Sequence, residues 1–176
     1  TLSPGDIFAI NAPYNGGTHL PDITIVNPIW NSKKSEIIFY TAARGHHTDI
    51  GGLTPGSMPC NSKDIHEEGI YIDNWKIVEN GIFREDSIKN KLLSGSYPAR
   101  SPLTNIADLK AQIAACKKGE TELLKIVDKY GLETVFRFQE LVCKNAENAV
   151  KESIKAIKST KITYQMDTDL SGAVRK

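Results

Sequence analysis

Several features that would assign a protein to a particular class are missing from this sequence. No stretch of the 176-residue chain reaches the roughly 18 to 20 apolar residues of a membrane-spanning helix, and no charged start followed by an apolar run indicates a signal peptide. The 22 basic residues are balanced by 21 acidic residues, so the net charge of +1 gives no long-range attraction for nucleic acid or anionic lipid. We therefore expect a cytoplasmic protein with no nucleic-acid and no membrane partner.

Cysteines and nucleotide-binding motifs are also scarce. Only Cys60, Cys116 and Cys143 occur, and an odd number of widely spaced cysteines favours reduced thiols over a disulfide framework. Neither a GxGxxG nor a GxxxxGK[ST] pattern is present, so we predict no phosphate-binding loop in this chain. Gly56-Ser57-Met58 lacks the GxSxG elbow of a serine hydrolase.

The first half of the chain has the composition of strands and loops. It contains all four histidines and most of the glycines and prolines. β-branched and aromatic residues bounded by turn signals predict strands; these are Ile7–Ile10, Ile23–Ile29 and Glu36–Ala42, with a further strand within Ile70–Val78. Arg84–Leu93 is predicted to be a short helix.

The second half has the periodicity of two amphipathic helices. Apolar residues recur every three or four positions in two stripes, which are Ile106, Leu109, Ile113 and Cys116, and then Val135, Phe138, Val142, Ala146, Ala149 and Ser153. Thr104 or Asn105 is the expected N-cap, and Gly131 separates the helices. We predict an α+β fold: a small antiparallel sheet with a metal-site hairpin in residues 1–82, a long helical hairpin in 104–158, and a polar tail in 159–176.

Two polar, glycine-flanked segments border the predicted hairpin. They are Asn15–Asp22 before its first strand and Arg44–Gly52 after its second. A turn at Asn31–Lys34 would pair residues whose numbers sum to 65, which makes His19 and His46 neighbours. Asp22 would lie at the mouth of the same hairpin and could face both imidazoles.

Two histidines and one carboxylate form a candidate metal site. His19, Asp22 and His46 suit Mn²⁺, Fe²⁺ or Zn²⁺ and leave coordination positions open for water or substrate. Side chains alternate along extended backbone, so His47 should point away from His46 and could orient substrate or carry a proton. Asp49 could hold an imidazole. The alternative is that these histidines only cap turns or form hydrogen bonds within loops.

Three motifs resemble the hydantoinase B/oxoprolinase family, and within it most closely the 5-oxoprolinases. They are Gly17-Thr18-His19-Leu20-Pro21-Asp22, Arg44-Gly45-His46-His47-Thr48-Asp49-Ile50-Gly51-Gly52 and Thr54-Pro55-Gly56-Ser57-Met58-Pro59. Asp108–Ala115 and Tyr130–Leu132 extend the similarity, which covers about Pro4 to Lys158. Cys60-Asn61-Ser62 departs from the expected Pro-His-Ser, so one histidine is missing from the pattern.

The resemblance implies an ATP-dependent hydrolase that opens 5-oxo-L-proline to L-glutamate in glutathione turnover. It implies a divalent metal (Mn, Zn or Fe) on His19, Asp22 and His46, by similarity to acetone-type carboxylases, and proton transfer by His47 and Asp49. Asn15, Thr18 and Arg44 are assigned to substrate binding. ATP and Mg²⁺ would bind a hydantoinase A-like module absent from this chain, so we expect the chain to be inactive alone and the intact enzyme to be an oligomer.

Two alternatives stay open. One is a related enzyme of the same family that hydrolyses hydantoins or carboxylates ketones with the same metal ligands. The other is a non-catalytic assembly domain, in which the helices bind another subunit and the histidines are structural.

Overall fold

The computed structural model describes residues 2–164 of the chain. They divide into two compact units, Thr1–Lys125 and Ile126–Lys176, which are described separately below. No helix in the described part is both long enough and apolar enough to traverse a lipid bilayer.

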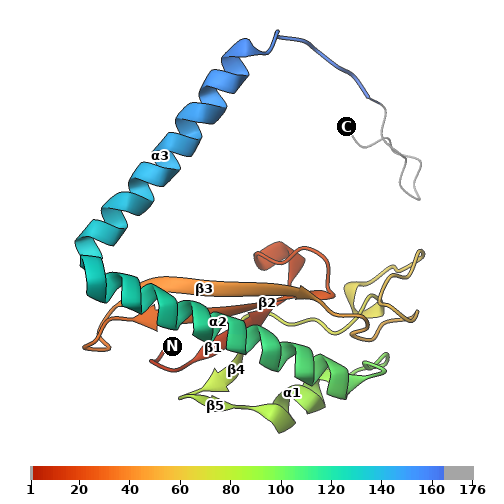
Figure 1. Cartoon of the computed structure of the whole chain (residues 1–176). Coiled ribbons are helices and arrows are strands. Elements are labelled where there is room, and N and C mark those ends of the chain that lie inside the picture. The colour runs from red at the N-terminus through yellow and green to blue at the C-terminus, as the bar shows by residue number, and fades with distance from the viewer. Residues whose placement is uncertain (1, 165–176) are drawn as a thin grey trace. The chain divides into compact units, whose positions relative to one another are not determined.

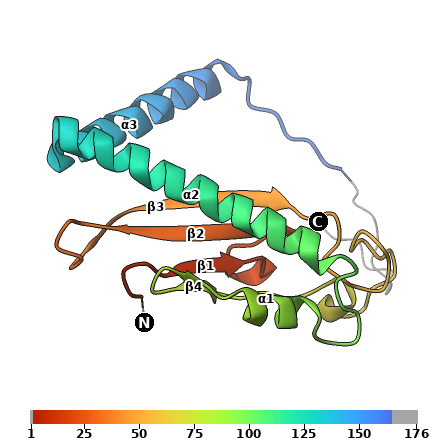
Figure 2. The ribbon, with the colours of Figure 1, turned by 60° about the horizontal axis from the view of Figure 1, so that its bottom comes forward.

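The first unit is built on a five-stranded antiparallel sheet with strand order β3-β2-β1-β4-β5 (Figures 1 and 2). Its strands are β1 (Ile7–Ile10), β2 (Asp22–Trp30), β3 (Ile37–His46), β4 (Trp75–Glu79) and β5 (Ile82–Phe83). The short 3-10 helices η1 (Pro13–Asn15) and η2 (Ile65–Glu67) lie in the connecting loops. β2 and β3 are the longest strands and form the hairpin that carries the polar motifs at its open end.

One face of the sheet is covered by α1 (Glu85–Leu92) and by α2 (Pro102–Tyr130), as Figure 2 shows for α2 over β2 and β3. Alternate strand residues point into this face because side chains alternate along a strand. The hydrophobic core joins buried residues of the strands, α1 and α2, including Ile7, Ile23, Ile25, Ile77, Ile88, Leu92, Leu109 and Cys116. The opposite face carries the half-exposed and exposed residues that alternate with the buried ones along these strands, among them Asp22, Arg44 and His46.

The antiparallel sheet and the helices confirm the predicted α+β fold class. The predicted strand Ile7–Ile10 is confirmed with the same bounds. Three details of the predicted strands were wrong. The second hairpin strand runs on to His46, so three of the four residues of the Arg-Gly-His-His motif are strand rather than loop. The strand expected within Ile70–Val78 begins only at Trp75, because the preceding segment bonds to the Asn11 side chain. The short strand β5 was missed.

Helix α2 begins three or four residues earlier than expected from a cap at Thr104 or Asn105. Pro102 opens it, as proline often does in the first helical turn, and the Ser101 carbonyl accepts from Asn105 N at 3.3 Å. Asn105 therefore lies inside the helix and is no N-cap. The break at Gly131 is confirmed: α2 ends at Tyr130, and Gly131 has a φ of +82°, which favours glycine.

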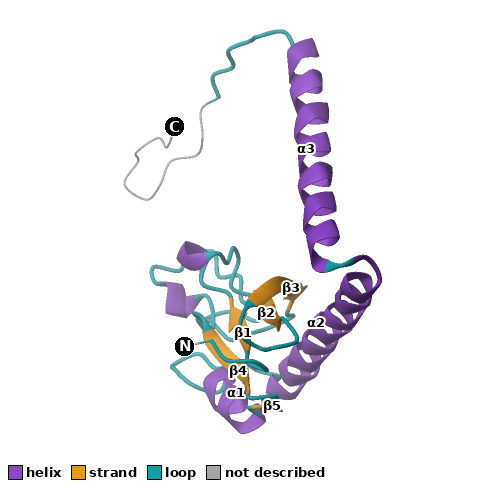
Figure 3. Cartoon of the chain, turned by 90° about the vertical axis from the view of Figure 1, so that its left-hand side faces the viewer, coloured by secondary structure: helices purple, strands orange, loops and turns teal. Residues whose placement is uncertain are grey.

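The second unit contains the end of α2 and the helix α3 (Leu132–Ala156), shown in purple in Figure 3. None of the residues of α3 is buried, and its exposed apolar side chains include Phe138, Leu141, Val142 and Ile154. The predicted second helix is therefore present. The packing of the two helices as a hairpin stays a prediction, and most of the predicted polar tail lies outside the described residues.

Candidate metal centre

The candidate ligands come from the open end of the β2–β3 hairpin and from the loop before it. Asp22 is the first residue of β2 and His46 is the last residue of β3, and the two are directly paired in the sheet. His19 lies in the loop between η1 and β2, and its carbonyl accepts from Asp22 N at 2.8 Å, which closes a turn. The hairpin thus brings together residues that are 24 positions apart in the chain.

The predicted strand register was wrong by three residues. Asp22 pairs with His46 and Ile29 with Phe39, so paired numbers sum to 68 rather than 65. The error arose at the turn, where the connection runs from Asn31 to Glu36, longer than the four residues assumed. The turn at His19–Asp22 still brings His19 beside His46, with 5.6 Å between ring centroids, so the predicted neighbours are correct for a different reason.

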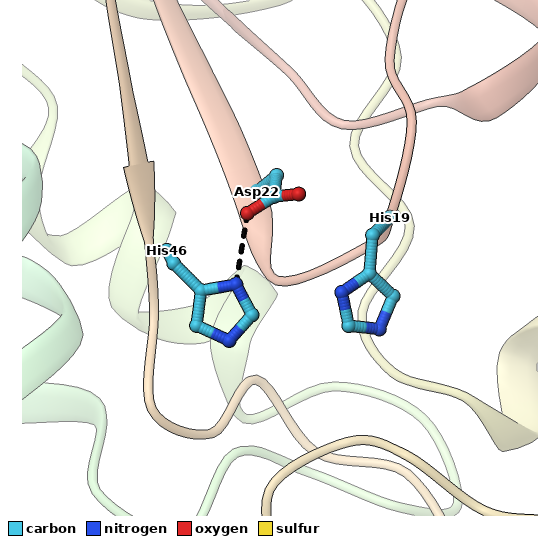
Figure 4. A group of neighbouring side chains, drawn as sticks. All are labelled: His19, Asp22 and His46. Atoms are coloured by element: carbon cyan, nitrogen blue, oxygen red, sulfur yellow. Dashed lines mark hydrogen bonds and ion pairs between the residues drawn. The ribbon is translucent and has the colours of Figure 1, made fainter.

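His46 and Asp22 form a hydrogen bond that fixes the imidazole (Figure 4). His46 Nδ1 lies 2.8 Å from Asp22 Oδ1. An ionised carboxylate only accepts hydrogen bonds, so the bonded hydrogen sits on Nδ1 and the lone pair sits on Nε2. The Nε2 lone pair and the second oxygen of Asp22 remain free of this bond. The carboxylate lies on the Nδ1 side of the ring, so an ion bound by both residues would take the place of the hydrogen on Nδ1.

The three side chains fit a single ion. One ligand atom from each of His19, Asp22 and His46 lies within 4.8 Å of the others. Ligands of one zinc ion lie about 2.1 Å from it, so they are at most about 4.2 Å apart, and only a small side-chain adjustment is needed. The side chain of His46 is 57% exposed and that of Asp22 is 26% exposed, so further coordination positions would open to solvent or substrate.

The loop that carries His19 is supported by close backbone packing. A Cβ at Gly17 would lie 2.3 Å from the Asn11 carbonyl oxygen, so only glycine fits there. The buried Asn11 side chain donates to Leu20 O and Ile70 O at 2.8 and 2.9 Å and accepts from Ile72 N at 2.7 Å. Asn11 therefore holds Leu20, the residue after His19, to a segment fifty residues further along the chain.

Of the three predicted substrate-binding residues, two lie together beside the cluster. Arg44 Nε donates to Thr24 Oγ1 at 2.9 Å, and Arg44 Nη1 lies 3.4 Å from Thr18 Oγ1. Arg44 and Thr24 form the next pair along the same sheet face from Asp22 and His46. Asn15 instead donates to Asp73 Oδ2 at 2.8 Å, so its side chain binds the loop before β4.

His47 points to the other side of the strand end, as the alternation predicted. Its side chain is fully buried, and its Nε2 lies 3.1 Å from Gln112 Oε1 while its Nδ1 accepts from Asn105 Nδ2 at 3.1 Å. Burial lowers the pKa of His47, and the hydrogen bond to Gln112 and the charge of Asp108 only partly oppose that effect. The neutral imidazole is therefore favoured, and among the described residues its ring hydrogen bonds go to Gln112 and Asn105 rather than to the His19–Asp22–His46 cluster.

Asp49 is also occupied by structural bonds. Its carboxylate accepts from Gly51 N, Gly56 N and Arg100 N at 3.0 to 3.2 Å and from Arg100 Nη1 at 2.7 Å. Burial would raise the pKa of Asp49, but these hydrogen bonds outweigh it, and the pKa is lowered. The catalytic roles of His47 and Asp49 stay predictions.

Two residues of α2 that support the hairpin were missed. Gln112 Nε2 donates to Ile23 O and Ala43 O at 2.8 and 2.9 Å, one on each hairpin strand. Asn105 donates to Asp49 O at 2.9 Å as well as to His47. A signal was available for Gln112, because it stands between Leu109 and Cys116 on the apolar stripe, where a buried polar side chain needs partners.

The fold and the cluster define an α+β domain with two histidines and one carboxylate at the open end of a hairpin. The model of the family described as Hydantoinase B/oxoprolinase matches residues 1–175, and the chain belongs to that family. It is 42% identical over 167 residues to 5-oxoprolinase 1 of Arabidopsis thaliana, a match that covers 89% of this chain and 13% of that protein. The chain therefore spans a small part of its relative.

Two solved structures share the fold. The ATP-dependent caprolactamase of Pseudomonas jessenii superposes with a TM-score of 0.67 and 33% identity, over 77% of this chain and 22% of that one. Acetone carboxylase superposes with a TM-score of 0.69 and 24% identity, over 77% of this chain and 17% of that one. The family match and the 5-oxoprolinase relative confirm the resemblance found in the motifs, and the two structures confirm the fold.

Proposed function

We propose that this chain supplies the divalent-metal centre of an ATP-dependent cyclic-amide hydrolase whose substrate is 5-oxo-L-proline and whose product is L-glutamate. The observation that carries the proposal is the grouping of His19, Asp22 and His46 with ligand atoms within 4.8 Å. The named 5-oxoprolinase relative supports the substrate. ATP and Mg²⁺ are assigned to a separate hydantoinase A-like module.

The side chains have distinct tasks in this proposal. His19, Asp22 and His46 would hold the ion, and in its absence Asp22 fixes the His46 imidazole through Nδ1. A divalent ion bound there would polarise the amide carbonyl or lower the pKa of a bound water by several units. His47 and Asp49 act as positioning residues, since they tie the end of β3 and the following loop to α2 and Arg100.

A hydantoin hydrolase is the second candidate function, because the family includes hydantoinase B and the cluster itself does not select the ring. A ketone carboxylase has less support, because the similarity to acetone carboxylase is 24% and establishes the fold only. In the non-catalytic alternative the histidines are structural and bind no metal, so metal binding separates this alternative from both enzymes.

Calorimetric titration of the chain with Mn²⁺ and with Zn²⁺ tests the metal centre. We expect one site per chain, and His46→Ala should weaken binding at least tenfold because it removes one of the three ligands and leaves Asp22 without its partner. His66→Ala is the matched control: this exposed histidine on η2 lies outside the cluster and should leave the affinity unchanged. Equal loss in both variants, or no binding to the wild-type chain, would contradict the proposal.

A further inference from the structure

Arg44 lies beside the candidate metal centre, and its guanidinium cation has no acidic partner. Among residues 2–164 no carboxylate lies within ion-pair distance of its guanidinium. Its three hydrogen bonds go to neutral acceptors: Thr24 Oγ1 at 2.9 Å, Thr18 Oγ1 at 3.4 Å and Gly16 O at 3.5 Å. By contrast, Arg100 has a carboxylate at 2.7 Å.

The neutral contacts hold the guanidinium in place without neutralising it. Thr24 belongs to β2, whereas Gly16 and Thr18 belong to the loop that also carries His19. A guanidinium has five N–H donors in a planar fork, and three are used here, two of them in contacts at the long limit of a hydrogen bond. The remaining donors and the full charge are available to an exposed ligand.

The position of Arg44 relative to the cluster is set by the strand register. The Thr24–Arg44 pair lies two residues along the hairpin from the Asp22–His46 pair, on the same face. That spacing is about 7 Å along a strand. A ligand the size of a five-membered ring with a carboxylate can therefore reach the exposed side of the candidate metal centre and the Arg44 guanidinium at the same time.

We propose that Arg44 binds the carboxylate of the cyclic amide, so that this site selects lactams that carry an acid group next to the ring nitrogen. This inference rests on the proposed function. In 5-oxo-L-proline the carbonyl carbon and the carbon bearing the carboxylate are the two neighbours of the ring nitrogen. A contact from Arg44 to the carboxylate therefore sets the orientation of the carbonyl toward the metal centre. Arginine binds carboxylates through two parallel hydrogen bonds, which adds orientation to charge.

The test compares 5-oxo-L-proline with 2-pyrrolidinone, the same ring without the acid group. The first readout needs no metal: in ¹⁵N spectra of the metal-free chain, 5-oxo-L-proline should shift the Arg44 Nε–H resonance and 2-pyrrolidinone should not. The second uses the Mn²⁺-loaded chain, in which relaxation of the ligand's ring protons should be enhanced at least tenfold more for 5-oxo-L-proline.

Two variants separate charge from general damage. Arg44→Met keeps an unbranched side chain but removes the cation, so it should abolish the difference between the two lactams. The Mn²⁺ affinity should stay within about twofold of wild type, because Mn²⁺ binding involves only the three metal ligands. Arg137→Met makes the same change on α3 and should leave both readouts unchanged. Arg44→Lys should retain only part of the preference, because lysine keeps the charge and loses the fork.

The outcomes distinguish this inference from the proposed function. If Mn²⁺ does not bind, the metal centre fails, and the metal-free shift still decides the role of Arg44. If the two lactams behave alike in the wild-type chain, or if Arg44→Met keeps their difference, the inference is overturned. A shift caused by inorganic phosphate but not by 5-oxo-L-proline would also overturn it and would identify Arg44 as a phosphoryl contact.

Discussion

His46 and His47 are neighbours in the chain with opposite surroundings. His46 is largely exposed and bonds to the Asp22 carboxylate, whereas His47 is fully buried and bonds to two neutral amides. The first environment stabilises a defined tautomer with a free lone pair, and the second disfavours the charged imidazole. One backbone step therefore separates a residue suited to bind a ligand from one suited to hold the strand.

The loop before β2 provides a prediction at the scale of one residue. Gly17→Ala should displace the His19 loop, because the new methyl group would lie 2.3 Å from Asn11 O and 2.6 Å from Ala12 O, both backbone atoms that cannot rotate away. We expect a loss of about 1–3 kcal/mol in unfolding free energy and weaker Mn²⁺ binding, measured by urea denaturation and calorimetry.

Gly119→Ala on α2 is the matched control for this substitution. Its added methyl group would meet only the Thr41 side chain, at 3.1 and 3.7 Å. Metal affinity should therefore remain at the wild-type value. If Gly17→Ala left both the unfolding free energy and the Mn²⁺ affinity unchanged, the conformation of the His19 loop would not depend on this close backbone approach.

At the scale of the elements, polar contacts from α2 join the two hairpin strands to the helix. Gln112 spans Ile23 O, Ala43 O and His47, and a Cβ at Gly45 would lie 3.1 Å from its amide. The glycine of the Arg-Gly-His-His motif thus makes room for a helix side chain. Every one of these bonds is buried or partly buried, where an unmade hydrogen bond costs about 1–3 kcal/mol.

A second set of polar contacts, around Asp6 just before β1, gives a prediction on the pH dependence of stability. Asp6 is 1% exposed; it accepts from Asn80 N at 3.0 Å and Ser3 N at 3.2 Å and lies 2.8 Å from Lys76 Nζ. Burial would raise the pKa of Asp6, but the contacts with Lys76 and the two backbone N–H groups lower it overall. The folded chain therefore releases the Asp6 proton more readily than the unfolded chain.

A lowered pKa in the folded state means that Asp6 stabilises the fold above the ordinary aspartate value of 3.8. That contribution is lost as the pH falls from about 3.8 through the lower folded value. Asp6→Asn should be less stable than wild type at pH 7, and urea denaturation should show this difference shrinking between pH 4 and pH 2. A difference that stayed constant over the whole range would contradict the assignment.

The sequence was sufficient to predict elements whose residues have a clear period, and it was insufficient where tertiary contacts decide. Ile7–Ile10 and the break at Gly131 follow from local chemistry. The hairpin register depends on the length of the Asn31–Glu36 connection, which local signals do not give. The proximity of His19, Asp22 and His46 was still predicted correctly, because all three lie close to the strand ends in either register, and their role as metal ligands stays a prediction.

At the scale of the whole molecule, the proposed function assigns to this chain one part of a larger reaction. It spans 13% of the length of its 5-oxoprolinase relative. Its open sheet face combines the candidate metal ligands and Arg44 with an apolar pocket of about 280 Å³, lined by residues that include Phe8, Val26 and Tyr40. The sequence has neither of the two phosphate-binding patterns that would hold ATP.

We therefore expect the Mn²⁺-loaded chain to release no L-glutamate from 5-oxo-L-proline, with or without ATP. Opening an unstrained lactam needs the free energy of ATP hydrolysis, and in the proposed division of labour that step belongs to the hydantoinase A-like module. A glutamate assay on the chain, with a full-length 5-oxoprolinase as the positive control, measures this directly. ATP-dependent glutamate release that disappeared in His46→Ala would show that this chain performs both steps, and the proposed division of labour would be wrong.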